Sequence, residues 1–161
     1  MASVVIWMII FFVQLGDRAI YTINLYIFIS SSLLMPLAYL FSKIVKADIF
    51  KKTDNPISKL GFMCTLNQML YILIVMWAYN QKPEAMMMLY AMVFGAHLMP
   101  FGWVYDSHAY IVASIVETIG ALVLGVCLGS SVTAVFMAVM EVVLVAFLFL
   151  EIRKEHRIIE S

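Results

Sequence analysis

The chain has 161 residues, of which 65% are apolar and 12% are charged, and its ten basic and ten acidic residues cancel. A soluble domain is about half apolar and about a quarter charged, so the charged residues of this chain are too few to cover a water-facing surface. The mean hydropathy of +1.01 also indicates a chain that is too apolar for a soluble domain. The composition excludes an ordinary soluble enzyme, a disordered chain and a nucleic-acid-binding protein, which needs an excess of Lys and Arg. An all-α, polytopic membrane protein is predicted.

Six apolar runs predict about six transmembrane helices, because about 20 apolar residues cross a hydrocarbon core of roughly 30 Å as a helix. The runs are 2–15, 20–44, 60–79, 85–105, 109–128 and 132–152. They would pair into three hairpins, at about 1–45, 60–105 and 109–152, within a single transmembrane domain, 1–161, that ends in a short tail, 153–161. The first run is the shortest, and no basic residue precedes it, so it is not a secretory signal.

The distribution of Lys and Arg predicts the orientation, since cytoplasmic loops carry an excess of both. With six spans, the second loop and the tail lie on one side of the membrane. That side would hold eight basic residues: Lys43, Lys46, Lys51, Lys52, Lys59, Arg153, Lys154 and Arg157. Only Arg18 and Lys82 would lie opposite. Both termini are therefore predicted to face the cytoplasm.

An internal repeat is indicated when the sequence is shifted by 64 residues. Leu-Met-Pro at 34–36 then aligns with Leu-Met-Pro at 98–100, and Leu-Tyr at 25–26 with Leu-Tyr at 89–90. A shift of two spans preserves orientation, so the first two hairpins would be parallel repeats. Pro36 and Pro100 each remove a backbone hydrogen bond, which predicts matching kinks. The segment that matches 60–66 is missing before Met1, and we expect that the chain shown starts partway into its first helix.

Polar side chains at membrane depth are the strongest functional indication, because a central charge costs about 3 kcal/mol even on lenient scales. Glu117 and Glu141 would lie about 12–14 Å into their spans, and His97 roughly 18 Å into its own. Asn67 and Gln68 would lie about 10–12 Å deep. Four helices would thus contribute polar groups at one level.

The residues around these groups favour inward-facing positions. Small residues three or four positions from Glu117 allow close approach of another helix, and Tyr71 is within one turn of both Asn67 and Gln68. The predicted ligand, ion or proton site therefore comprises Glu117, Glu141, His97, Asn67, Gln68 and Tyr71. The competing interpretation is a neutral Glu that only links helices by hydrogen bonds.

The same residue types allow several chemistries, and the sequence leaves them open. Glu and His can carry protons, while two carboxylates with His and an amide oxygen can hold a divalent cation. As a pocket for an amine they would supply the compensating negative charge. Whether a metal binds is not decided, and no cofactor motif occurs. Cys64 and Cys127 lie in apolar runs without metal-ligand spacing and are interpreted as small packed residues.

The stretches 59–62, 67–71, 76–77 and 90–98, with Pro100, resemble a family of small, uncharacterised bacterial multi-pass integral membrane proteins. The similarity extends along most of the chain. It implies a helical protein of the bacterial inner membrane, and it implies no activity and no functional residue.

The leading functional hypothesis is binding or transport of a small solute or ion, coupled to protons through the midplane residues. The partners expected are the lipid bilayer and that solute, ion or proton, and not nucleic acid; a homo-oligomer is left open. One alternative is an intramembrane enzyme for a lipid or quinone, which would need a polar cluster nearer one interface. The other is a non-catalytic accessory or scaffold subunit. Of these hypotheses, the sequence favours the non-enzymatic ones.

Overall fold

The computed structural model describes residues 1–44 and 56–159; Lys46, Lys51 and Lys52, which contributed to the predicted orientation, lie outside them. The described residues form helices joined by short turns, and none of them forms a strand. The helices are α1 (Ala2–Gln14), α2 (Ile20–Ser32), α3 (Leu34–Ile44), α4 (Pro56–Gln81), α5 (Pro83–Ala96), α6 (Leu98–Val104), α7 (His108–Cys127) and α8 (Ser130–Ile159). The all-α class is confirmed.

Five helical stretches are long and apolar enough to cross a membrane, which makes the chain a multi-pass membrane protein. These are Ile20–Ile44, Lys59–Gln81, Pro83–Val104, His108–Cys127 and Ser130–Arg153. The first predicted span forms α1, a helix of 13 residues. At 1.5 Å per residue α1 is about 20 Å long, which is short of a hydrocarbon core of roughly 30 Å.

Two of the long stretches are interrupted at corresponding points. The interruption at Leu33 separates α2 from α3, and the one at His97 separates α5 from α6. Each preceding helix ends four residues before a proline, at the residue whose carbonyl would have accepted the bond from the missing N–H of Pro36 or Pro100. The helix is therefore interrupted at both places for the same reason.

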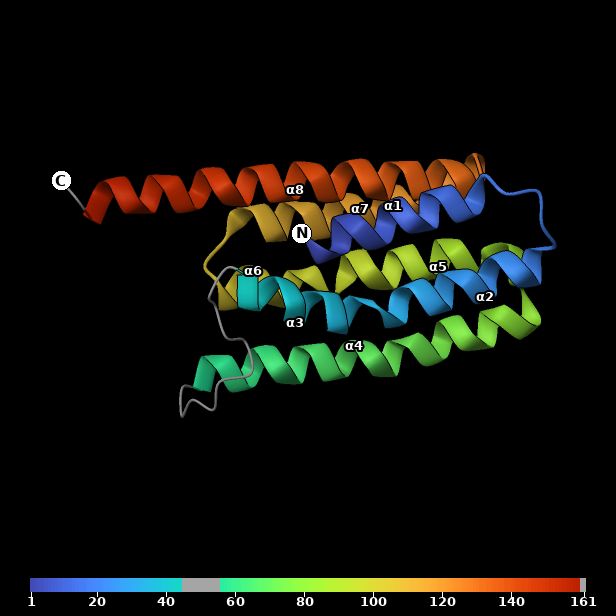
Figure 1. Ribbon diagram of the computed structural model, residues 1–161, viewed down its shortest axis with the longest axis horizontal. Helices are drawn as coiled ribbons and strands as arrows, with labels where there is room; N and C mark the ends of the chain where they lie inside the picture. Colours follow the sequence, from blue (N-terminus) through green and yellow to red (C-terminus); the bar gives the residue numbers. More distant parts are fainter. Residues whose placement is uncertain (45–55, 160–161) are drawn as a thin grey trace.

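The helices pack side by side with α5 in the middle and α4 at one edge (Figure 1). α5 contacts α2, α4, α7 and α8, and its stretch Pro83–Val104 is the most buried of the five. The core is centred on Trp7 of α1, whose ring contacts Tyr90 at 5.5 Å and Phe94 at 5.2 Å between centroids. α4 packs mainly against α5 and α6 and also contacts α2 through Tyr79. It exposes large apolar side chains around most of its circumference.

Glycines set the closest helix contacts. A Cβ at Gly95 of α5 would lie 2.9 Å from both Glu117 Cβ and the Thr118 backbone nitrogen of α7. A Cβ at Gly120 of α7 would overlap the ring of Phe136 in α8. These approaches bring α7 close to both of its neighbours, as the small residues around Glu117 predict.

Glu151 fixes the end of the bundle where α7 begins. Its Oε2 accepts a hydrogen bond from Ser107 Oγ at 2.5 Å, and its Oε1 accepts one from the Ala109 backbone nitrogen at 3.2 Å. A carboxylate is favourable at a helix N-terminus because the unpaired N–H groups there carry partial positive charge. Glu151 therefore acts as a long-range cap for α7.

Candidate functional site

Glu117 and Glu141 both face the interior of the bundle, as predicted. Their side chains are 0% and 1% exposed, and they belong to the adjacent helices α7 and α8. Two negative charges at this depth are unfavourable without compensation, so the pair favours a bound proton or cation.

The two carboxyl groups differ in their hydrogen bonds. Glu141 Oε2 accepts a bond of 2.6 Å from Ser3 Oγ of α1, whereas Oε1 has no partner among the described residues. Both oxygens of Glu117 lack a hydrogen-bond partner in the described part of the chain. The hydrogen-bonded helix link that the packing interpretation requires is thus present for Glu141 and not for Glu117.

His97 lies at the interruption between α5 and α6. Its Nδ1 donates to the backbone carbonyl of Phe94. This bond leaves Nε2 as the nitrogen that can exchange a proton. The imidazole packs edge-on against Phe94 at 4.9 Å and Phe101 at 5.9 Å between ring centroids. His97 is therefore held in one orientation by its own helix and by two aromatic rings.

A cavity of about 600 Å³ brings part of the predicted set together. It is partly open, and it is bounded by the N-terminal end of α1 together with α2–α6, α7 and α8. Glu141, His97 and Gln68 line it, and so do Ser3 and Ser31. Its size is within the range of roughly 300–1,000 Å³ that is usual for pockets for small molecules.

Three of the six predicted site residues do not line the cavity. Asn67 is exposed, Tyr71 is 46% exposed, and neither lines the cavity. Residues four apart lie on the same side of a helix, while adjacent residues differ by about 100°. The rotation of α4 that turns Gln68 toward the cavity therefore turns Asn67 and Tyr71 outward. Glu117 is buried beside Gly95 and does not line the cavity either.

The sequence prediction missed an aromatic row along the cavity. The row runs along α5 and α6 to the start of α7 and consists of Tyr90, Phe94, His97, Phe101, Tyr105 and Tyr110, all of which line the cavity. Neighbouring rings are 4.9–6.4 Å apart between centroids. The spacing of three or four residues from 90 to 105 is the signal that would have revealed it, since this spacing marks one helix face.

The family model described as "Family of unknown function (DUF7010)" matches residues 1–151. The chain belongs to this family. No curated protein and no solved structure matches the chain. The DUF7010 match includes every residue that lines the cavity. The resemblance to an uncharacterised family is confirmed, and it assigns no activity.

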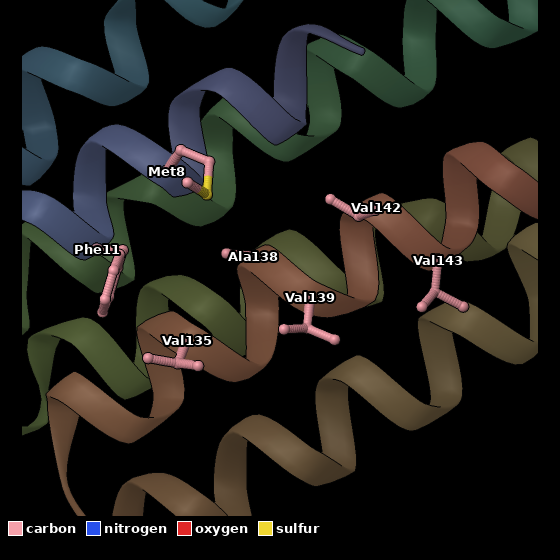
Figure 2. A pocket seen from close by; sticks show the side chains of 7 residues that line it. All are labelled: Met8, Phe11, Val135, Ala138, Val139, Val142 and Val143. Carbon is pink, nitrogen blue, oxygen red and sulfur yellow. The ribbon is translucent and has the colours of Figure 1, made fainter.

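A second pocket in this DUF7010 chain has a different character (Figure 2). It has a volume of about 320 Å³ and lies between Met8 and Phe11 of α1 and a surface of α8 formed by four valines and Ala138. All of these side chains are apolar. Such a surface fits hydrocarbon chains, and it offers no group that could orient a polar ligand or transfer a proton.

The chemistry available at the larger cavity is that of hydrogen bonding, proton exchange and charge compensation. Glu141 provides a carboxylate, His97 an imidazole, and Gln68 an amide. Across the described residues, no three His, Cys, Asp or Glu side chains are grouped as a metal ion would require.

Proposed function

We propose that this membrane protein binds or transports a small solute, with protons as coupling ions, through the cavity at His97, Gln68 and Glu141. The observation that carries the proposal is the cavity itself, which reaches a buried carboxyl group and an imidazole inside an otherwise apolar bundle. Ionisable residues placed inside a membrane bundle mark ion, proton or substrate sites as a rule.

The interrupted helices support this proposal. Transporters commonly form their sites where paired membrane helices are discontinuous, because backbone groups freed there face a cavity. Leu34 follows the first interruption, His97 forms the second, and both line the cavity. A helix pair that is interrupted at corresponding positions is the arrangement expected for a binding site between repeats.

The two interruptions also support the internal repeat. They lie 64 residues apart, which is the shift that aligns the two Leu-Met-Pro sequences. Their backbone angles are similar, with φ −75° and ψ −10° at Leu33 and φ −69° and ψ −15° at His97. We propose that the first two of three hairpins arose by duplication, with α1 as part of a sixth span.

Neither alternative function gains comparable support. An intramembrane enzyme would need a polar cluster near one interface, and the cluster at Ser107 and Glu151 already serves as a helix cap. A scaffold subunit would use its buried carboxyl groups as helix links. That role fits the Ser3–Glu141 bond but gives no reason for Glu117.

Access of water to the cavity is the experiment that tests the proposed function. Ser31 lines the cavity, whereas Ala134 is fully buried outside it. In a background that lacks Cys64 and Cys127, Ser31→Cys should react with a water-soluble methanethiosulfonate reagent, and Ala134→Cys should not. Labelling is measured by mass shift in proteoliposomes. Equal protection of both cysteines would rule out a solute pathway through this cavity.

We also propose a location in the bacterial inner membrane with both termini in the cytoplasm. The ends of α3 and α8 and the start of α4 lie at the same end of the bundle (Figure 1). Lys43, Lys59 and Arg153 belong to that end, and Arg18 and Lys82 to the opposite one. This separation supports the orientation given by the positive-inside rule.

Labelling from outside the cell tests the orientation. In the cysteine-free background, an impermeant maleimide should modify Gln81→Cys, which lies at the end of α4 predicted to face outward. Ser58→Cys and Ser161→Cys should react only after the membrane is permeabilised. The reverse pattern would show that the termini face outward.

A further inference from the structure

We propose that the ligand of the cavity is an organic cation, an amine or quaternary ammonium group attached to an apolar body. The inference rests on the proposed solute-binding function and names its substrate class. Three properties of the cavity carry it: the charge of its wall, the aromatic rings along it, and its size.

The described residues of the wall include one acidic side chain and no Lys or Arg. Glu141 is the one residue with an ionisable acidic or basic side chain, other than His and Tyr, among the described residues that line the cavity. Its side chain is 1% exposed, and its Oε1 lacks a hydrogen-bond partner within the described residues.

A second carboxyl group is buried on the neighbouring helix. Glu117 does not line the cavity and is fully buried on α7, the helix that packs against α8 and its Glu141. No Lys or Arg side chain among the described lining residues offsets either group. A cation that enters the cavity can therefore replace the proton on Glu141 and pair with its carboxylate, whereas an anion finds no Lys or Arg side chain among the described lining residues.

The aromatic row provides the second recognition element. Tyr90, Phe94, Phe101, Tyr105 and Tyr110 line the same cavity as Glu141. Aromatic faces attract cations within about 6 Å of the ring centre, most strongly when water is excluded, and rings of this kind are used to bind quaternary ammonium groups. The row continues to Tyr105, which is 59% exposed, so the rings form a continuous path from the buried site to the C-terminal end of α6.

The size of the cavity distinguishes an organic cation from a metal ion. A volume of about 600 Å³ is far larger than a dehydrated inorganic ion needs. One carboxylate without a second acidic ligand on the wall is also too few for a divalent ion, which takes several oxygen ligands. An apolar body carrying one positive charge matches both the rings and Glu141.

Benzyltrimethylammonium and its neutral carbon isostere neopentylbenzene form the test pair, with benzoate as an anion. Binding is measured by calorimetry on the full chain in lipid nanodiscs. We expect the cation to bind at least roughly tenfold more tightly than the neutral isostere, the ratio that about 1.4 kcal/mol of charge recognition would produce. Glu141→Gln should remove most of this preference. Glu84→Gln, the same change at an exposed residue outside the cavity, should leave it intact.

The aromatic contribution has its own pair of variants. Tyr110→Phe keeps the ring and should keep cation binding, whereas Tyr110→Leu should weaken it by roughly fivefold or more. Equal affinity for the cation and neopentylbenzene, or a preference for benzoate, would overturn the organic-cation inference and leave solute binding standing. If no probe binds, the inference is also wrong. If Ser31→Cys is in addition unreactive, the proposed function fails as well.

Discussion

Replacing Glu117 by leucine should stabilise the protein, although it removes a candidate functional group. Both carboxyl oxygens of Glu117 are buried without a hydrogen-bond partner among the described residues. An unsatisfied buried polar group costs about 1–3 kcal/mol, and an apolar side chain of similar size avoids that cost. We expect the free energy of unfolding of Glu117→Leu to rise by about 1–3 kcal/mol, measured by equilibrium unfolding in mixed detergent micelles.

Glu141→Leu is the matched comparison, because this residue has the partner that Glu117 lacks. Removing Glu141 also removes the acceptor of the 2.6 Å bond from Ser3 Oγ. The loss of about 0.5–1.5 kcal/mol for that bond offsets part of the gain. Glu141→Leu should therefore be less stable than Glu117→Leu. A strongly destabilised Glu117→Leu would mean that Glu117 links helices in the membrane, and would favour the scaffold interpretation.

The conservative substitution separates function from packing. Glutamine keeps the length of the side chain and most of its hydrogen-bonding capacity but cannot carry the charge or the proton. If the carboxyl groups serve transport, Glu117→Gln and Glu141→Gln should fold normally and lose the pH dependence of ligand binding. Buried polar groups that lower stability are characteristic of sites kept for function.

The sequence was sufficient to predict the all-helical class and the inward direction of both carboxyl groups. It also indicates where two of the spans are interrupted, because the missing N–H of each proline ends the preceding helix four residues earlier. The direction of Glu117 follows from Ala113, Ser114 and Ala121, small residues on its own face that are buried with it. These predictions depend on local chemistry, which a single sequence records directly.

The rotation of α4 could not be predicted in the same way. In a membrane both the lipid and the bundle interior are apolar, so a span at the edge of the bundle has no hydrophobic face to orient it. α4 exposes the apolar side chains of Phe62, Met63 and Leu70 on its outside and places the polar Gln68 at the cavity. The pattern of apolar residues therefore does not show which face is turned inward. The Ser3–Glu141 bond was also missed, because it joins residues 138 positions apart that only the tertiary fold brings together.

Gly95→Ala should lower the free energy of unfolding by one of the largest amounts that a single added methyl group can cause in this protein. The new Cβ would lie 2.9 Å from Glu117 Cβ and from the backbone nitrogen of Thr118, neither of which can move without shifting α7. Overpacking of this kind typically costs about 1–3 kcal/mol. The loss should be visible as a lower midpoint in the same unfolding measurement.

Gly61→Ala is the control, since it is the same change in a helix with space around it. Its Cβ would meet no atom nearer than Val104 Cγ1 at 3.8 Å. Without a clash, alanine should stabilise the helix by up to about 1 kcal/mol, because glycine is the poorer helix former. The same added methyl group should thus lower the free energy of unfolding at Gly95 and raise it at Gly61. Equal stabilisation at both would show that α5 and α7 are not in close contact.

The Gly95 substitution also has a consequence for the cavity. Gly95 lies between Phe94 and the His97 interruption on α5, and its neighbour across the contact is Glu117. Pushing α7 away from α5 would therefore displace the buried carboxyl group together with Tyr110, the residue that α7 contributes to the cavity lining. We expect Gly95→Ala to weaken binding of benzyltrimethylammonium as well as stability, whereas Gly61→Ala should change stability alone. A variant that unfolds more easily but binds the cation with unchanged affinity would show that the α5–α7 contact does not position the site.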